Sequence, residues 1–268
     1  DMPSEGTQEP RVALVMMDTH APEWPVWSSS GCATALSGVD LTKHLSVVTM
    51  TYYLNLQYAR RHGYDLLFLQ LQGKGCAHYK CGAGCEHELW GPRHASYCKV
   101  AGLGEALAQK QYEWVVYVDS DAFIANASLT LPALIGAYGG KDADAHAFFG
   151  WDWPYTLGPN MGFIALRNSP EADELVRAWW HLHPGAFAET HPFEQHALHW
   201  QLMHMERFRA HIHTLELITM DSEAGATAVA HLDHNAGTKQ RLWTMATAVA
   251  DHLCSGSRLG HVCSKRLR

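Results

Sequence analysis

Three short apolar segments, alternating with two segments of helical spacing, constrain this chain more than any other feature. The apolar runs are Val12–Met17, Tyr64–Leu71 and Trp114–Val118. Apolar side chains recur at helical spacing from about Leu41 to His62, Gly63 follows as a helix stop, and residues 99–110 predict a second helix. Continuous apolar runs are typical of buried strands. The order strand–helix–strand–helix–strand therefore predicts a parallel sheet of the α/β class.

The second half of the chain predicts more strands and helices of the same unit. Residues 147–149 and 161–166 read as strands, Ser169-Pro170 opens a helix, and another helix covers about Phe193 to Glu206. Residues 1–10 are polar, and we expect a flexible N-terminal segment there. The length of 268 residues allows one or two domains, and no repeat or linker divides it. Residues 11–268 are therefore predicted to form a single domain with a Cys-rich insertion at 73–98.

Composition and charge exclude several classes of protein. The chain is 47% hydrophobic and 18% charged, which excludes a disordered chain and a pure coiled coil. The net charge of −7, without a dense basic run, argues against a nucleic-acid partner. The longest uncharged run, Ala122–Gly140, is too polar for a membrane span. We expect contact with a membrane only through an N-terminal anchor preceding Asp1.

Seven cysteines predict disulfides rather than a zinc site. Cys254 and Cys263 close a short loop, Cys32 stands apart, and the other four crowd one segment: Cys76, Cys81, Cys85 and Cys98. Their spacing fits a structural zinc site poorly. Disulfides need an oxidising compartment, and Asn126-Ala127-Ser128 is an N-glycosylation sequon. Both features predict a secretory protein.

The sharpest chemical motif is Asp119-Ser120-Asp121, directly after the third apolar run. The carboxyl ends of strands are where open α/β sheets bind ligands. Unpaired carboxylates are costly to bury, so a hard cation is a natural partner for this pair. A solvated turn is the alternative interpretation of a D-x-D motif in this position.

Three further segments are candidates for the same site. Residues 231–239 contain histidines that could complete a metal shell, Gly237 that allows backbone to approach a phosphate, and the cation Lys239. With 19 histidines in the chain, this motif means little unless the aspartate pair lies near it. Residues 193–196 read as a helix cap pair or as part of a sugar site, and residues 158–162 read as a turn.

Taken in order, these segments resemble glycosyltransferase family 34, the retaining galactosyl-, mannosyl- and xylosyltransferases. The resemblance spans about residues 12–240. Its motifs are Tyr58–Phe68, Tyr97–Val100 leading into Asp119–Ala122, Gly158–Gly162 leading into Ile164–Ser169, Glu194–Leu198 and His234–Gly237. The resemblance implies a GT-A fold, which is a nucleotide-binding, Rossmann-like mixed sheet flanked by helices. It also implies a UDP-sugar donor, a divalent cation, usually manganese, and a glycan or glycoprotein acceptor in the Golgi lumen.

The resemblance also assigns residues. Asp119 and Asp121 hold the metal, with His234 as its third ligand. The residues expected at the transferred sugar, and therefore at the chemistry, are Asn160, Glu194 and Gln195. Those expected at the nucleotide part of the donor are Met17, Asp18, Thr19, Lys99, Ser120, Gly237 and Lys239. Retention could come from same-face attack, which we favour, or from a protein nucleophile, for which Glu194 is the candidate.

Two other functions stay open at this stage. Phe193 and Asn235 stand where the family tends to have an acidic and an aromatic residue, which is compatible with an inactive nucleotide-binding scaffold or partner subunit. Ten tryptophans and ten tyrosines are compatible with a secreted sugar-binding module. Such a module has no need of the aspartate pair.

Overall fold

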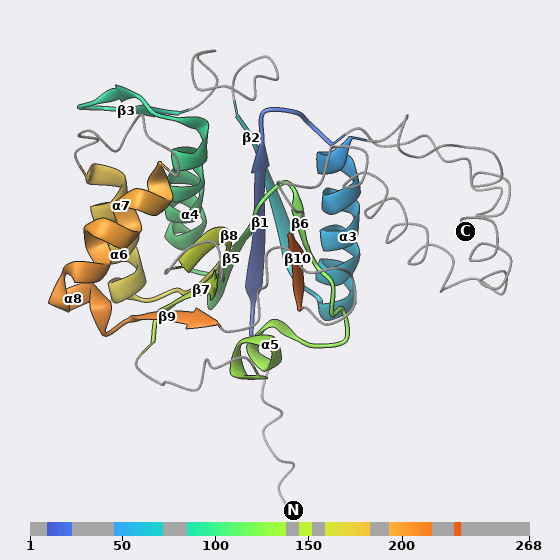
Figure 1. Cartoon of the computed structure of the whole chain (residues 1–268). Helices are drawn as coiled ribbons and strands as arrows, with labels where there is room; N and C mark the ends of the chain where they lie inside the picture. Colours follow the sequence, from blue (N-terminus) through green and yellow to red (C-terminus); the bar gives the residue numbers. More distant parts are fainter. Residues whose placement is uncertain are drawn as a thin grey trace, which may run out of the picture.

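The computed structural model describes residues 10–22, 46–71, 85–137, 145–151, 159–182, 193–215 and 228–231. Its centre is a six-stranded mixed sheet in the order β2-β1-β5-β8-β7-β9, with helices on both faces (Figure 1). The strands are β1 (Val12–Asp18), β2 (Asp65–Gln70), β5 (Trp114–Val118), β7 (Ala147–Trp151), β8 (Pro159–Arg167) and β9 (Ile212–Leu215). This architecture confirms the predicted α/β class.

The three apolar runs of the first half form the parallel part of the sheet. β1 pairs in parallel with both β2 and β5, whereas β8 runs antiparallel to β5. The prediction of a mixed sheet is therefore correct. β1 and β5 are buried along almost their whole length, and β2, at the end of the strand order, is half-buried.

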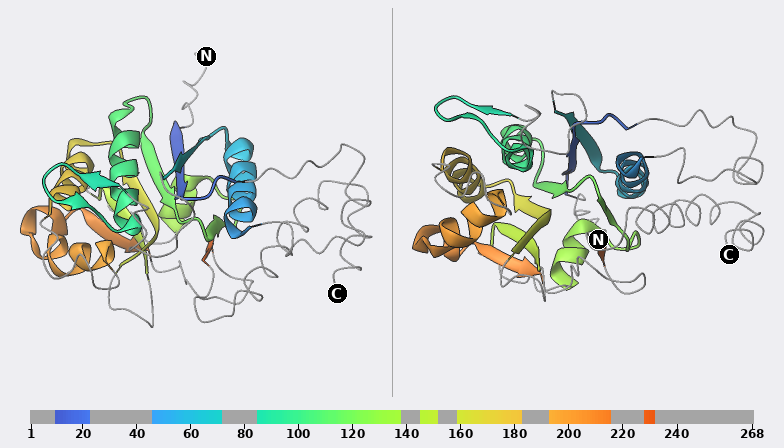
Figure 2. Two further views of the ribbon diagram at one scale, coloured as in Figure 1. Left: turned by 90° about the horizontal axis from the view of Figure 1, so that it is seen from above. Right: turned by 45° about the horizontal axis from the view of Figure 1, so that its top comes forward.

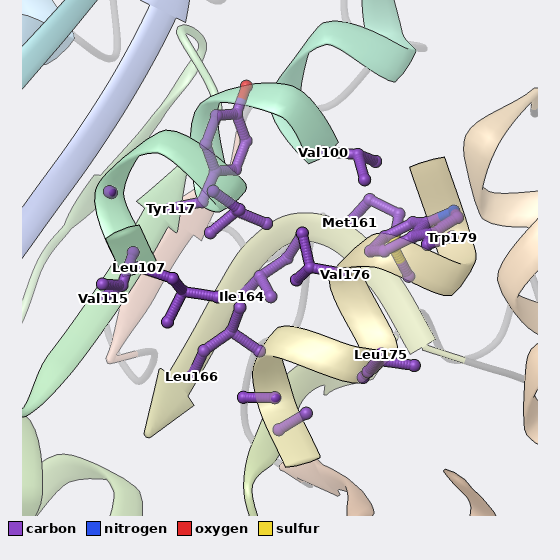
Figure 3. Close-up of a cluster of buried hydrophobic side chains, with 14 of the residues drawn as sticks. Val100, Leu107, Val115, Tyr117, Met161, Ile164, Leu166, Leu175, Val176 and Trp179 are labelled. Carbon is purple, nitrogen blue, oxygen red and sulfur yellow. The ribbon is translucent and has the colours of Figure 1, made fainter. Parts of the chain in front are cut away.

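Helices cover the two faces of the sheet (Figure 2). On one face lie α4 (Cys98–Ala108) and α6 (Pro170–His181), whose apolar side chains pack with those of β5 and β8 (Figure 3). The other face is covered by α3 (Val47–His62), with α5 (Leu131–Ala137) and β6 (Ala122–Ile124) beside it. β10 (Val229–His231) pairs antiparallel with β6. Among the described residues, no helix is long and apolar enough to cross a membrane.

The ends of α3 and α6 follow the sequence signals. Ser169 caps α6 by accepting a hydrogen bond from the amide of Ala172, with proline in the first turn. Gly63 ends α3 with φ of 68°, a left-handed conformation in which residues with a Cβ are strained.

The single helix predicted over 193–206 is wrong. The segment forms α7 (Glu194–Trp200), a 3-10 turn (Leu202–His204) and α8 (Glu206–Arg209). Leu202 and Phe208 are both buried, although a separation of six residues on a straight helix would point them about 120° apart. The break between the pieces turns both side chains toward the core.

The described part of the Cys-rich segment, residues 85–98, is closed by a disulfide and hydrogen-bonded to the end of α6. A disulfide joins Cys85 to Cys98, the first residue of α4, which confirms that the clustered cysteines form a disulfide; the sequence left their pairing open. Between them lies the hairpin β3 (Glu86–His87) and β4 (Gly91–Pro92). The Arg93 guanidinium donates to the carbonyls of Trp180 and Leu182 at the end of α6, at 2.7 and 3.0 Å. Residues 1–9 and the cysteines at 32, 76, 81, 254 and 263 lie outside the described residues.

We expect two glycine-to-alanine substitutions to have opposite effects on stability. Gly63→Ala should lower the free energy of unfolding by about 1 kcal/mol, because alanine is strained at this positive φ. Gly136→Ala, inside α5 with open space around its Cβ, should raise it by about 0.5–1 kcal/mol. Urea unfolding curves measure both. Equal effects of the two substitutions would contradict the positive φ at Gly63.

Candidate metal and donor site

The polar residues of interest gather where β1 and β5 end. The two strands are parallel neighbours, so Asp18 and Thr19, at and just after the end of β1, lie at the same edge of the sheet as Asp119, which follows β5. The turn after β5 is held by the Ala122 amide, which donates to the Asp119 carbonyl at 2.9 Å. The Asp119 amide donates to the carbonyl of Gly162 on β8 at 3.0 Å. This is the edge at which open α/β sheets bind ligands.

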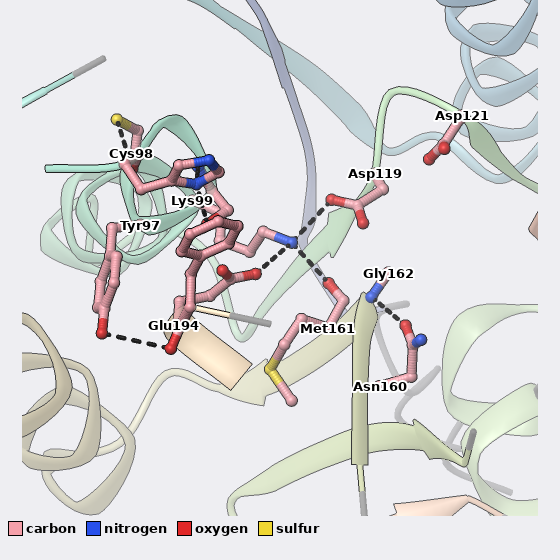
Figure 4. Close-up of polar contacts among 12 residues, drawn as sticks. Tyr97, Cys98, Lys99, Asp119, Asp121, Asn160, Met161, Gly162 and Glu194 are labelled. Atoms are coloured by element: carbon pink, nitrogen blue, oxygen red, sulfur yellow. Dashed lines mark hydrogen bonds and ion pairs between the residues drawn. The ribbon is translucent and has the colours of Figure 1, made fainter. Parts of the chain in front are cut away.

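A buried ammonium lies at the centre of the site (Figure 4). Lys99, in the first turn of α4, places its Nζ 2.9 Å from Asp119 Oδ1 and 3.1 Å from Glu194 Oε1. It also donates to the carbonyl of Met161 at 3.3 Å. An ammonium has three protons, and these three acceptors match them. Lys99 is 5% exposed, so the contacts are shielded from water.

Two carboxylates keep this lysine charged. Burial alone would lower the pKa of Lys99, but the charges of Asp119 and Glu194 more than offset it, so the pKa lies above its ordinary value. The ammonium also lies 5.2 Å from the ring centroid of Tyr117. Burial, followed by the Asp119 charge, raises the pKa of the Tyr117 hydroxyl well above its usual range. At neutral pH the site therefore holds a charged lysine and a neutral tyrosine.

An imidazole faces the two aspartates. His231 Nε2 lies 3.0 Å from Asp121 Oδ1 and 3.8 Å from Asp119 Oδ2. The antiparallel pairing of β10 with β6 sets this position, because His231 pairs with Ala122, the residue after Asp121. One ligand atom from each of Asp119, Asp121 and His231 lies within 4.8 Å of the others. Two carboxylates and an imidazole form a donor set suited to a divalent cation such as Mn²⁺.

The charge state of His231 follows from these neighbours. Burial lowers the pKa of His231. The charge of Asp121 and its hydrogen bond, followed by the charge of Asp119, raise this pKa by more than burial lowers it, so the pKa lies above its ordinary value. In the absence of a cation, the protonated ring pairs with the aspartates. A cation would need the neutral ring, so it competes with this proton.

The predicted third metal ligand, His234, lies outside the described residues, as do Gly237 and Lys239. The structure instead places His231, from the same histidine-containing segment, beside the aspartate pair. The sequence contained the signal, but with several histidines in one segment only the strand pairing of β10 shows which one reaches the site. The assignment of His234 stays a prediction.

Other predicted site residues lie around this centre. Ser120 is half-buried between the aspartates, Met17 is 6% exposed at the end of β1, and Asp18 Oδ1 accepts the His20 amide at 2.8 Å. Asn160, on β8, accepts the Gly162 amide through Oδ1 at 2.6 Å (Figure 4). Gln195 is buried in the first turn of α7, beside Glu194.

Phe193, the residue before Glu194, has a strained backbone conformation. Its φ of 46° is the one positive value among the described non-glycine residues. Its ring stacks on that of His94, with centroids 3.6 Å apart. Its carbonyl accepts the Tyr97 hydroxyl at 3.4 Å, and the Glu194 carbonyl accepts the Trp179 indole N–H at 3.0 Å. Strain of about 1–3 kcal/mol persists where surrounding contacts enforce it, and functional sites are common places for it. Nothing in the residue pattern signals this strain.

Comparison with known proteins identifies the fold. No protein-family model matches the chain, and no curated protein matches it. A glycosyltransferase involved in the glycosylation of the major capsid of PBCV-1 has a similar structure, with a TM-score of 0.59 and 15% identity over 89% of this chain and 100% of that one. The protein therefore has the GT-A glycosyltransferase fold. Membership of glycosyltransferase family 34 stays a prediction.

Two weaker likenesses are to bacterial enzymes. The glycosyltransferase GlyE of Streptococcus pneumoniae TIGR4 matches with a TM-score of 0.47 and 10% identity, over 92% of this chain and 64% of that one. Glucosyl-3-phosphoglycerate synthase from Mycobacterium tuberculosis matches with a TM-score of 0.35 and 13% identity, over 90% of this chain and 80% of that one.

We expect Lys99→Met to destabilise the protein by about 3 kcal/mol or more, because it leaves buried and half-buried carboxylates without their cation. Adding Glu194→Gln should recover part of this loss, since it removes one of those charges. Lys110→Met, at an exposed lysine, should change the unfolding free energy by less than about 0.5 kcal/mol. Urea unfolding measures all three. A Lys99→Met protein as stable as the Lys110→Met protein would contradict the central role of Lys99.

The raised pKa of His231 makes the stability of the metal-free protein depend on pH. The protonated ring stabilises the fold fully below the unfolded pKa of about 6.5, and this stabilisation disappears as pH rises through the higher folded pKa. In chelator, the difference in unfolding free energy between wild type and His231→Gln should therefore shrink as pH rises from 5.5 to 9. A difference that grows with pH would contradict the pairing of His231 with the aspartates.

Proposed function

We propose that the protein is a metal-dependent, retaining glycosyltransferase that transfers a sugar from a UDP-sugar to a glycan or glycoprotein. Galactose or xylose is the proposed sugar. One observation carries the proposal: Asp119, Asp121 and His231 converge within 4.8 Å at the ligand-binding edge of a GT-A sheet. A mere solvated turn would not explain why a buried imidazole from a distant strand faces both carboxylates.

The donor set fits the cation. Asp119, Asp121 and His231 would hold Mn²⁺ through carboxylate oxygens and a ring nitrogen, and the two aspartates are only half-buried. A cation bound there would neutralise charge on the departing nucleoside diphosphate. Met17, Asp18 and Thr19, at the same edge, are proposed to line the nucleoside pocket.

The Lys99–Glu194 pair supports same-face attack over a covalent intermediate. Glu194 Oε1 lies 3.1 Å from the buried Lys99 ammonium, and a carboxylate engaged in this way is a weak nucleophile. In the same-face route, the acceptor oxygen bonds to the anomeric carbon while the bond from that carbon to the phosphate oxygen breaks. The leaving phosphate takes the hydroxyl proton. Glu194, Gln195 and Asn160 are then proposed to position the sugar and the acceptor.

The compartment is proposed to be the lumen of the Golgi. The Cys85–Cys98 disulfide supports an oxidising environment. The sequon also supports it, because Ser128 is exposed and Asn126 half-exposed in the loop after β6. An N-terminal membrane anchor preceding residue 1 is part of the same proposal.

The first test is a thermal-shift titration with Mn²⁺ plus UDP, GDP or CMP. UDP at 100 times its dissociation constant should stabilise the wild type by about 2.7 kcal/mol, and only when Mn²⁺ is present. Asp121→Ala should abolish the shift. Glu105→Ala, which removes an exposed carboxylate from α4, should keep it. A shift that persists in Asp121→Ala would contradict the assigned site.

Turnover and stereochemistry follow in a second assay. Incubation with UDP-galactose or UDP-xylose and Mn²⁺ should release UDP, and NMR of the transferred sugar should show the α-anomer. A β-linked product would overturn retention while keeping the transferase. Binding of UDP and Mn²⁺ without hydrolysis of any donor would favour the inactive scaffold. Sugar binding that survives chelator and ignores UDP would favour the sugar-binding module.

A further inference from the structure

Two polar side chains of α3 are completely buried beside the aspartate turn. Thr51 and Asn55 are both 0% exposed. They lie four residues apart, on one face of the helix. The Thr51 hydroxyl has a polar partner on another element of the fold. Burying polar groups is unfavourable unless they form hydrogen bonds, so their partners show what the pair does.

Thr51 holds the residue between the two aspartates. Its hydroxyl lies 2.6 Å from the carbonyl oxygen of Ser120. The carbonyls of Val47 and Val48, within α3, lie farther away at 3.1 and 3.2 Å. A hydroxyl has one proton to donate, and the shortest contact is to Ser120. The bond therefore ties α3 to the peptide that precedes Asp121.

Asn55 holds the chain on the other side of Asp121. Its Nδ2 donates to the Ala122 carbonyl at 3.0 Å, and its Oδ1 accepts the Ile124 amide at 3.1 Å. Its second Nδ2 proton faces the sulfur of Met16 on β1 at 3.3 Å. A side-chain amide with both donors and its oxygen engaged is held in one orientation.

We propose that Thr51 and Asn55 are positioning residues that set the geometry of the candidate cation site. Together they hydrogen-bond to the backbone at Ser120, Ala122 and Ile124, so α3 holds the chain directly before Asp121 and again from the Ala122 carbonyl onward. Backbone bonds complete the turn: the Ala122 amide, in the peptide after Asp121, donates to the Asp119 carbonyl, and the Asp119 amide donates to the Gly162 carbonyl on β8. The inference rests on the proposed function for the presence of a cation. The hydrogen bonds from Thr51 and Asn55 to the turn are present in the structure whether or not a cation binds.

The test compares two variants of Thr51 with a matched control. Thr51→Val keeps the shape and removes the hydroxyl, whereas Thr51→Ser keeps the hydroxyl. The control is Tyr58→Phe, which also removes a buried hydroxyl of α3 that donates to a loop carbonyl, that of Leu129 at 3.0 Å. Leu129 lies after β6, away from the aspartate turn. Asn55→Leu provides a second, independent variant.

Mn²⁺ affinity is measured by EPR and stability by urea unfolding. We expect the dissociation constant to rise at least fivefold in Thr51→Val and Asn55→Leu, and to stay within twofold of wild type in Thr51→Ser and Tyr58→Phe. Tyr58→Phe should lose stability as Thr51→Val does, so a merely structural role would move the two alike. Wild-type affinity in a folded Thr51→Val protein would overturn the inference.

Hydrogen–deuterium exchange of the metal-free protein separates this inference from the proposed function. Amides of residues 119–122 should exchange at least fivefold faster in Thr51→Val than in wild type, Thr51→Ser or Tyr58→Phe. If the wild type binds no Mn²⁺ with or without UDP, the proposed function fails while this readout still decides whether the pair holds the turn. Unchanged exchange in Thr51→Val would show that it does not.

Discussion

The buried ammonium of Lys99 is the interaction on which the site depends. It comes from the first turn of α4 and contacts the turn after β5, the carbonyl of Met161 on β8 and the first residue of α7. These elements are distant in sequence, and a charge inside the protein is tolerated only when its partners surround it. The same requirement fixes Asp119 and Glu194. Without Lys99, these half-buried and buried carboxylates would lose the cation that neutralises them.

Around this centre, the two faces of the sheet contribute different things. The face with α4 and α6 supplies Lys99 and, through the disulfide and Arg93, a fixed start for α4. The face with α3 supplies neutral hydrogen bonds to the backbone of the aspartate turn. β10 adds His231 from the far end of the described chain. Lys99 thus comes from the face with α4 and α6, whereas the imidazole of His231 and the side-chain hydrogen bonds to the aspartate turn come from the face with α3, β6 and β10.

Much of this arrangement could be predicted from residues in sequence. Apolar runs located β1, β2 and β5, and the motif after β5 located both aspartates, because the carboxyl ends of strands are where open α/β sheets bind ligands. The helix over 193–206 was mispredicted, since its periodicity gives no sign that Leu202 and Phe208 must reach one core from two short pieces. His231 was within the predicted segment, but His234 was chosen as the ligand by resemblance alone.

The sequence by itself determined the α/β class, the strands β1, β2 and β5 with the helices between them, and the edge of the sheet that carries the aspartate pair. These follow from local patterns: hydrophobic runs, caps and a polar turn after a strand. The tertiary structure alone decided that Lys99 pairs with Glu194, that His231 faces the aspartates and that Phe193 is strained. It also decided that Thr51 and Asn55 hold the turn. Each of these depends on which distant segments lie side by side, and spacing along one chain carries no information about such contacts.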